Sequence, residues 1–136
     1  GKLTNRRDAF YVNIGGWDSH NDAFDTLTSK CPNIDNAIDS FAQEMKALNL
    51  WNNVTIVTAS DFGRTLTSNG AGTDHGWAGN HMIVGGSVRG GKIHGEYPSD
   101  LSDDGDYNVG RGRLLPTTSW EMLWQGIAEW FGVEDG

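Results

Sequence analysis

The sequence of 136 residues holds one cysteine, Cys31, and only ten basic residues against eighteen acidic ones. A single cysteine allows no disulfide within the chain, so it leaves the redox compartment open. The formal net charge of −8 argues against a nucleic-acid-binding groove, because such a groove needs clustered Lys and Arg. The sequence therefore predicts that nucleic acid is not the partner.

Long apolar runs and several catalytic motifs are also missing. No run approaches the roughly 18 apolar residues that span a bilayer, and the pair Arg6-Arg7 is followed by "DAFYVNIGGWD" rather than by the apolar core of an export signal. The glycine-rich stretch "GGSVRGGKIHG" lacks the order of a phosphate-binding loop, and no H-E-x-x-H or G-x-S-x-G is present. These absences exclude a membrane span, a P-loop nucleotidase and a serine hydrolase of the elbow type.

What is present favours one globular domain. The chain is 37% hydrophobic with six tryptophans, which is enough apolar material for a single core, and nineteen glycines indicate many loops. We predict short strands at residues 9–15, 52–60 and 81–86, helices at 34–48 and 119–131, and a loop at 87–113. We expect the tryptophans of the last helix to pack in the core. Strands that alternate with helices favour an α/β fold with a mainly parallel sheet flanked by helices.

Polar side chains gather after each predicted strand. Asp18 and His20 follow the first strand, Asp61 and Arg64 follow the second, and Asp74 and His75 lie in the loop that enters the third. In open α/β sheets, ligands bind outside the carboxyl ends of the strands. If the first two strands are parallel neighbours, these clusters meet at one edge despite their separation in sequence.

Each cluster has a chemical and a purely structural interpretation. Asp18 and His20 are two positions apart and could share an ion, or Asp18 could cap a turn. Arg64 has a planar fork suited to phosphate or sulfate, or it could pair with Asp61 or Asp74. His75 lies between glycine-rich segments as a candidate zinc, manganese or iron ligand that Asp74 could accompany or orient, or it could simply bond a carbonyl. We expect His81 to be structural or to support the ligands.

Four stretches together carry a family resemblance: "IGGWDSHND", "IVTASDFGRTLTSNGAGTDHGWAGNHMIVGG", "VRGGKIHGEYP" and "GRLLPTTSWEML" with "WFGV". In this order they resemble the C-terminal portion of the bacterial family named domain of unknown function fifteen hundred and one. That family looks like a branch of the alkaline-phosphatase superfamily, which also contains sulfatases and cofactor-independent phosphoglycerate mutases. The resemblance implies that residues 1–136 are the C-terminal portion of a single alkaline-phosphatase-like domain, incomplete without an upstream part, and that the protein is periplasmic or secreted.

The resemblance also implies a metal site. Asp18, His20 and His75 resemble the ligands of one divalent ion, and Asp61 resembles a ligand of a second ion. Phe62 stands where the superfamily has a histidine beside that aspartate, so the second ion is in doubt unless Asp74 substitutes. The nucleophile and another aspartate are expected upstream of Gly1, and nothing around Cys31 matches a sulfatase cysteine.

The expected function is therefore a metal-dependent hydrolase of phosphate or sulfate esters. Zinc is the first choice of ion, with manganese, calcium or magnesium as alternatives. The predicted metal ligands are Asp18, His20, Asp61, Asp74 and His75, with catalytic roles for Arg64 and Asp61. A small anionic ester is the expected substrate, and the upstream part of the same protein is the expected partner. The alternatives are a non-catalytic binding or scaffold relative, and an extracellular glycan-binding domain suggested by the six tryptophans.

Overall fold

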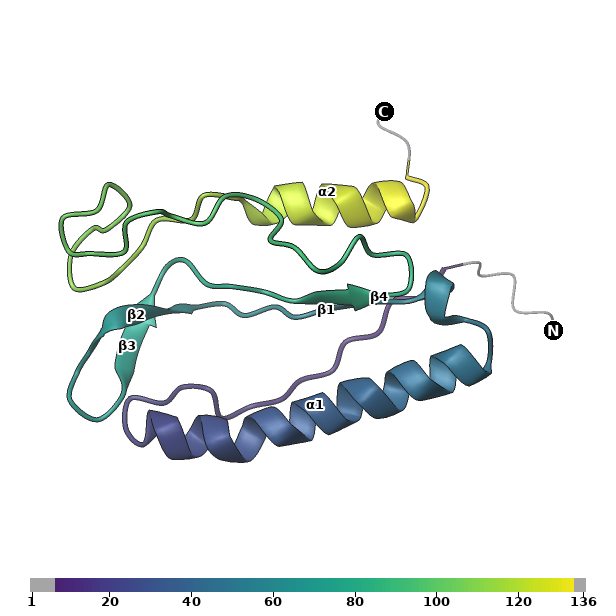
Figure 1. Ribbon diagram of the computed structural model, residues 1–136, viewed down its shortest axis with the longest axis horizontal. Helices are drawn as coiled ribbons and strands as arrows, with labels where there is room; N and C mark the ends of the chain where they lie inside the picture. The colour runs from purple at the N-terminus through teal and green to yellow at the C-terminus, as the bar shows by residue number, and fades with distance from the viewer. Residues whose placement is uncertain (1–6, 134–136) are drawn as a thin grey trace. The chain divides into compact units, whose positions relative to one another are not determined.

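A computed structural model describes residues 7–133 (Figure 1). These residues form two compact units. One unit spans Trp17–Thr117. The other joins the described residues of the two chain ends, 7–16 and 118–133. Every side chain of the candidate site described below belongs to the first unit.

Helix α1, Ala23–Ala47, is the longest element of the unit 17–117. It begins eleven residues before the predicted start at 34, and Pro32, which we took as part of a start signal, lies inside it. A proline inside a helix removes one backbone donor, but the turns on either side can still close. Here the side-chain amide of Asn33 donates to the carbonyl of Ser29, 3.0 Å away, across the proline turn. The helix therefore continues through a residue that usually marks an end.

Two short antiparallel ribbons make up the strands of this unit (Figure 1). After a single 3₁₀ turn, η1 (Trp51–Asn53), strand β1 (Thr55–Val57) pairs with β4 (Ile83–Gly85). Between them in sequence, β2 (Gly63–Ser68) pairs with β3 (Thr73–Gly76), and Arg64 lies opposite His75. The register shifts between Arg64 and Ser68, so β2 carries a bulge.

The prediction of a mainly parallel α/β sheet is wrong for the described residues. All of their strand pairs are antiparallel and each sheet has two strands. The segment from 61 to 80, which we predicted as a loop, turns back on itself as the β2–β3 ribbon and returns the chain to pair with β1 through β4. A parallel pair needs a crossover of a dozen or more residues into a neighbouring strand, whereas a direct return gives antiparallel pairing.

The predicted first strand, 9–15, is also absent: these residues form no helix or strand. Phe10, Tyr11 and Val12 are 90%, 86% and 80% exposed. A sequence with strong β preference becomes a strand only when another strand lies beside it, because the preference reflects packing and ladder bonds with neighbours. No such neighbour exists in the described part of the chain.

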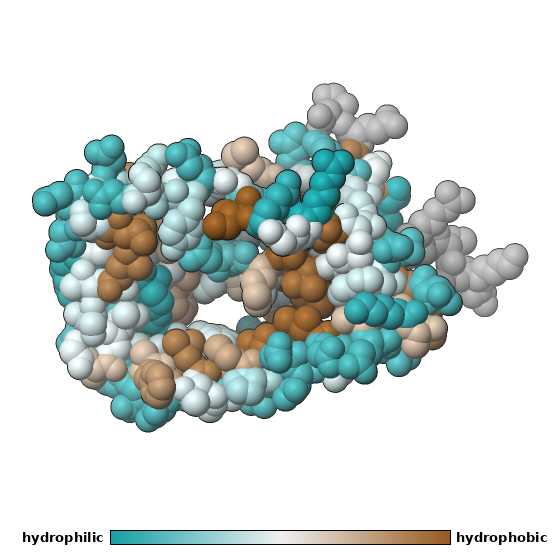
Figure 2. Space-filling model, viewed as in Figure 1, coloured by the Kyte–Doolittle hydropathy of each residue, from teal (hydrophilic) through white to brown (hydrophobic). Residues whose placement is uncertain are grey.

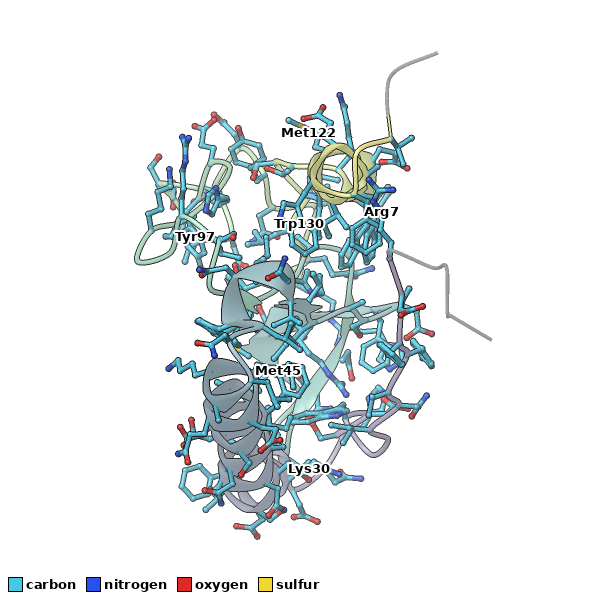
Figure 3. The ribbon with its side chains drawn as sticks, turned by 90° about the vertical axis from the view of Figure 1, so that its right-hand side faces the viewer. Arg7, Lys30, Met45, Tyr97, Met122 and Trp130 are labelled. Atoms are coloured by element: carbon cyan, nitrogen blue, oxygen red, sulfur yellow. The ribbon has the colours of Figure 1, made fainter. Side chains whose placement is uncertain are left out.

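The unit formed by the chain ends contains helix α2, Trp120–Trp130, which confirms the helix predicted at 119–131. Ser119 occupies the cap position, and Figure 3 labels Met122 and Trp130 along the helix. Trp124 and Trp130 are 45% and 41% exposed, so the expected core packing of these tryptophans is wrong. One helix beside an irregular segment offers too little surface to cover them. No helix within residues 7–133 has the length and apolar character to cross a membrane, in agreement with the sequence.

Little of the described chain is buried. Ala42 of α1 is 8% exposed and Thr65 of β2 is 5% exposed, and no large side chain among residues 7–133 is fully buried. Figure 2 shows apolar side chains reaching the visible surface, as the 80% exposure of Phe24 at the start of α1 illustrates. Close polar contacts around the β2–β3 ribbon are therefore the most specific interactions of this unit.

Candidate metal centre

Three of the predicted metal ligands lie together. Asp18 and His20 come from the segment before α1, and His75 comes from β3. Each offers one ligand atom, and these three atoms lie within 4.8 Å of one another. The structure thus unites residues that are 57 positions apart in sequence.

Asp18 is the centre of the group. Its Oδ1 lies 3.0 Å from Nε2 of His20 and 2.6 Å from Nε2 of His75. The two imidazole rings stack with their centroids 5.0 Å apart, and the three side chains are each about half exposed, at 58%, 47% and 47%. One face of the group is therefore open to solvent and to a ligand.

Asp74 contacts the opposite edge of His20. Its Oδ1 lies 3.3 Å from His20 Nδ1 and accepts a hydrogen bond of 3.1 Å from the side-chain amide of Asn69. The same amide donates to the backbone carbonyl of His20 at 3.0 Å. A carboxylate on the second nitrogen of a histidine is the usual support of a metal-ligating imidazole, since it fixes the ring and its tautomer. Asp74 thus has the position of an orienting residue.

Arg64 ties the segment before α1 to the ribbon. Its guanidinium donates to the carbonyl of Trp17 and, at 2.8 Å, to the carbonyl of Thr73. It also lies 3.3 Å from Asp18 Oδ1. The side chain is only 25% exposed, so most of its donors face protein atoms. Arg64 explains how Asp18 reaches β3 without any parallel strand pair.

Gly72 makes a second close contact between the same two segments. A Cβ added at Gly72 would lie 2.6 Å from the carbonyl oxygen of Ser19 and 2.7 Å from that of His20. Real Cβ atoms do not approach backbone oxygens so closely, so this position requires glycine. The backbone of the Asp18–His20 segment therefore rests directly on the turn that joins β2 to β3.

The bulge in β2 provides the contact for a further loop. Leu66 donates its backbone N–H to the carbonyl of Gly112 at 2.9 Å, which places Gly110–Gly112 against the ribbon. Arg111 at the centre of this turn donates to Asp74 Oδ2 at 2.8 Å. Neither Arg111 nor Asn69 was singled out from the sequence. The Gly-Arg-Gly pattern was the signal that could have drawn attention to Arg111.

Phe62 lies flat against His75. Their rings are 3° from parallel with centroids 4.2 Å apart, and the guanidinium carbon of Arg64 lies 5.0 Å from the centre of the same phenyl ring. Phe62 thus contributes a ring that packs against a predicted ligand. Phe62 fixes the orientation of His75 and adds no ligand of its own.

Both carboxylates of the site are biased towards the charged form. The hydrogen bond with His75, followed by the charges of His75, His20 and Arg64, lowers the pKa of Asp18 below its ordinary value. The pKa of Asp74 is also lowered. The hydrogen bond from Asn69 is the largest cause, followed by the hydrogen bond with His20 and the charge of Arg111. Charged carboxylates are the forms that bind cations, so this electrostatic environment suits a metal centre.

Two other predicted residues lie apart from this group. Asp61 is exposed and is not among the His, Cys, Asp and Glu side chains of residues 7–133 that cluster closely enough to share an ion. Its predicted role as a ligand or catalytic residue stays a prediction. His81 precedes β4, and the pKa of its imidazole is lowered, mainly because desolvation by neighbouring atoms disfavours the charged form.

The donor set fits a zinc ion better than a magnesium or calcium ion. Zinc binds imidazole nitrogens and carboxylate oxygens at about 2.0–2.2 Å, whereas calcium and magnesium prefer oxygen ligands alone. The three ligand atoms lie within 4.8 Å of one another, and a small outward movement of Asp18 from the two histidines lets them surround one ion. Three protein ligands with an open face form the pattern of catalytic zinc sites, in which water or substrate takes the remaining position.

The sequence family described as protein of unknown function (DUF1501) matches residues 4–119 of the chain. The chain belongs to this family. The match contains every residue of the group around Asp18, as well as Asn69 and Arg111. For this DUF1501 member, no curated protein and no solved structure gave a significant match.

Proposed function

We propose that this DUF1501 protein is a metal-dependent hydrolase of phosphate or sulfate esters, and that Asp18, His20 and His75 hold its zinc ion. The proposal includes an alkaline-phosphatase-like origin for the site, on the strength of the motifs quoted above. One observation carries it: a single carboxylate oxygen lies within 3.0 Å of the Nε2 atoms of two histidines, one of which has a second carboxylate at its other nitrogen.

The side chains of the site have three roles: to hold the ion, to orient its ligands and to bind the anionic group. When bound, the ion would polarise the ester and lower the pKa of a bound water or nucleophile. Asp18 and the two histidines supply its ligands, and their open side leaves room for an ester oxygen. Asp74 and Asn69 hold the ring of His20, and Phe62 holds the ring of His75. A guanidinium at the edge of the site balances the charge of the nonbridging oxygens.

Metal binding is the first test. We expect the metal-free protein to bind one zinc ion per chain in calorimetric titration, and we expect His75→Ala to abolish this binding. His94→Ala is the matched control, because His94 is exposed in the same unit and its ring nitrogen lies 3.2 Å from the carbonyl of Arg89, away from the candidate ligands. Equal zinc binding by all three proteins would overturn the assignment of the site.

Turnover is the second test. p-Nitrophenyl phosphate, p-nitrophenyl sulfate and bis(p-nitrophenyl) phosphate are to be offered to the zinc, manganese and calcium forms of the full-length protein. We expect hydrolysis of at least one ester, and its loss in Asp18→Asn, because the amide retains the shape of the carboxylate but loses its charge. Zinc binding without turnover of any ester would contradict a hydrolase.

The stacking of Phe62 on His75 favours a second candidate, a non-catalytic relative that keeps one structural ion. An aromatic ring parallel to a ligand at 4.2 Å rigidifies the site and occupies a place next to it that a second ion would need. In that case zinc raises the thermal stability, and Asp18→Asn lowers the melting temperature of the zinc form without any activity to lose. The turnover test separates the two functions.

A further inference from the structure

Two arginines border the candidate site, and they have opposite surroundings. The guanidinium of Arg64 donates to two backbone carbonyls and lies next to Asp18. Only 25% of the side chain is exposed. Such a group holds protein segments together. It has few donors left for a substrate.

Arg111 is 66% exposed, and within residues 7–133 its guanidinium pairs with Asp74. The contact is made through one nitrogen, Nη2, to Asp74 Oδ2 at 2.8 Å. The other carboxylate oxygen of Asp74 faces His20 Nδ1, so a single carboxylate separates this guanidinium from a ligand of the candidate ion. The remaining N–H groups of the planar fork can bind an oxyanion in the bidentate manner that arginine favours.

The backbone conformation of residues 110–112 holds Arg111 beside Asp74. Gly110, Arg111 and Gly112 have φ values of 99°, 58° and 67°, three left-handed residues in a row. Glycine adopts this region readily, but arginine does so at a cost, and such outliers concentrate at functional sites. Gly112 lies so close to β2 that an added Cβ would be 2.5 Å from the backbone nitrogen of Thr67. The turn is therefore fixed against the bulge and holds Arg111 beside Asp74.

We propose that Arg111, and not Arg64, is the residue that binds the anionic phosphoryl or sulfuryl group of the substrate. This inference rests on the proposed function, since it names the specificity-determining residue of the same site. Arg64 is a positioning residue that acts through the carbonyls of Trp17 and Thr73 to keep Asp18 next to His75. Removing Arg111 should therefore weaken anion binding, whereas removing Arg64 should weaken zinc binding.

The experiment measures two affinities for each variant by calorimetry. Zinc is titrated into the metal-free protein, and inorganic phosphate and sulfate are then titrated into the zinc form. For Arg111→Gln we expect unchanged zinc affinity and a loss of phosphate affinity of about 10- to 100-fold, the size of one charge-assisted interaction. For Arg64→Gln we expect weakened zinc affinity. Arg89→Gln, at an exposed arginine of the same unit, is the control for a change of net charge.

The outcomes separate this inference from the function on which it rests. A wild-type protein without zinc affinity overturns both. Zinc binding with equal phosphate affinity in the wild type and Arg111→Gln overturns the role of Arg111 alone, and shows that its contact with Asp74 is only a surface ion pair. A phosphate affinity that falls equally in Arg111→Gln and Arg89→Gln also overturns it, because net charge then explains the loss.

Discussion

The β1–β4 and β2–β3 ribbons have the same simple plan but are fixed by different kinds of contact. Around β1–β4 the bonds beyond the ladder are neutral: Thr58 and Met82 exchange bonds of 3.0 and 2.8 Å, and Gly86 donates to the carbonyl of Trp51 at 3.1 Å. Around β2–β3, neutral bonds such as that from Leu66 to Gly112 are joined by contacts from charged or ligand-bearing side chains, which reach residues up to 57 positions away.

This difference shows how one short ribbon becomes a site while the other remains a scaffold. A neutral backbone bond holds two segments together and requires little of the side chains. A guanidinium, a side-chain amide and paired carboxylates hold segments together and also orient charged groups at their junction. We therefore expect changes near β1–β4 to affect stability alone, and changes near β2–β3 to affect stability and metal binding together. Three predictions test this separation.

The largest effects are expected from two glycines, one in each ribbon. Gly72→Ala drives a methyl group into the carbonyls of Ser19 and His20, and Gly85→Ala drives one towards the carbonyl of Val54, 2.5 Å away. We expect both to lower the free energy of unfolding by about 1–3 kcal/mol, as overpacking does. Only Gly72→Ala displaces His20, so only this variant loses zinc affinity, by more than about tenfold.

Urea unfolding and zinc calorimetry on the two variants provide the measurement, at a temperature where both are folded. The contrast between the ribbons would fail if Gly85→Ala lost as much zinc affinity as Gly72→Ala. Equal zinc affinity of Gly72→Ala and the wild type would remove the argument that the turn of β2–β3 positions His20.

An intermediate effect is expected at the carboxylate that supports His20. Asp74→Asn keeps the size of the side chain but removes the charge that faces Nδ1, and loss of such a support weakens metal affinity by about 10- to 100-fold. Asp61→Asn is the matched change outside the group, and its zinc affinity should equal that of the wild type. Zinc titrations of both variants measure this. A large loss in Asp61→Asn would support the predicted role of Asp61 as a ligand.

The smallest effect is a difference in pH response between the ribbons, measured without metal. The pKa of His81, beside β4, is lowered from its ordinary value of 6.5, so the unfolded chain binds a proton that the folded chain resists. The free energy of unfolding therefore decreases as the pH falls below 6.5, because the unfolded chain takes up this proton more readily. The pKa values of Asp18 and Asp74 are lowered from 3.8, so their contribution is present above 3.8 and is lost as the pH falls further.

Urea unfolding between pH 7 and pH 3 in the presence of a chelator checks both windows. We expect His81→Gln to flatten the pH dependence of the unfolding free energy below 6.5, and the double variant Asp18→Asn/Asp74→Asn to flatten it below 3.8. If His81→Gln left the pH dependence between pH 6.5 and 3.8 unchanged, the desolvation of His81 would have no energetic consequence.

Local signals predicted some elements well and others poorly. Helix α2 was predictable because apolar spacing and Ser119 both indicate a helix at that place. The strand near β4 was predictable from its β-branched residues and the glycines that follow. The first eleven residues of α1 and the whole β2–β3 ribbon were missed. Pro32 resembled a helix start, and the polar, glycine-rich sequence of β2 and β3 gives no alternating pattern.

The candidate site was assembled from the sequence for a reason that does not hold. Asp18, His20 and His75 were expected to meet at the edge of a parallel sheet, yet no parallel pair exists among the described residues. They meet because Arg64 bonds two carbonyls and Gly72 allows close backbone approach. The chemistry of the three side chains was readable, but the contacts that unite them were not.

The sequence alone determined the donor types, the excess of acidic charge, the absence of a long apolar span and the helix at the chain end, since these depend on composition and on residues close together in the chain. Only the tertiary structure decided which donors share a site, that Asp74 faces His20, and that Arg111 is exposed while Arg64 is covered. These facts depend on where distant backbone segments come to rest, and such contacts are set by many weak interactions that leave no periodic mark in the sequence.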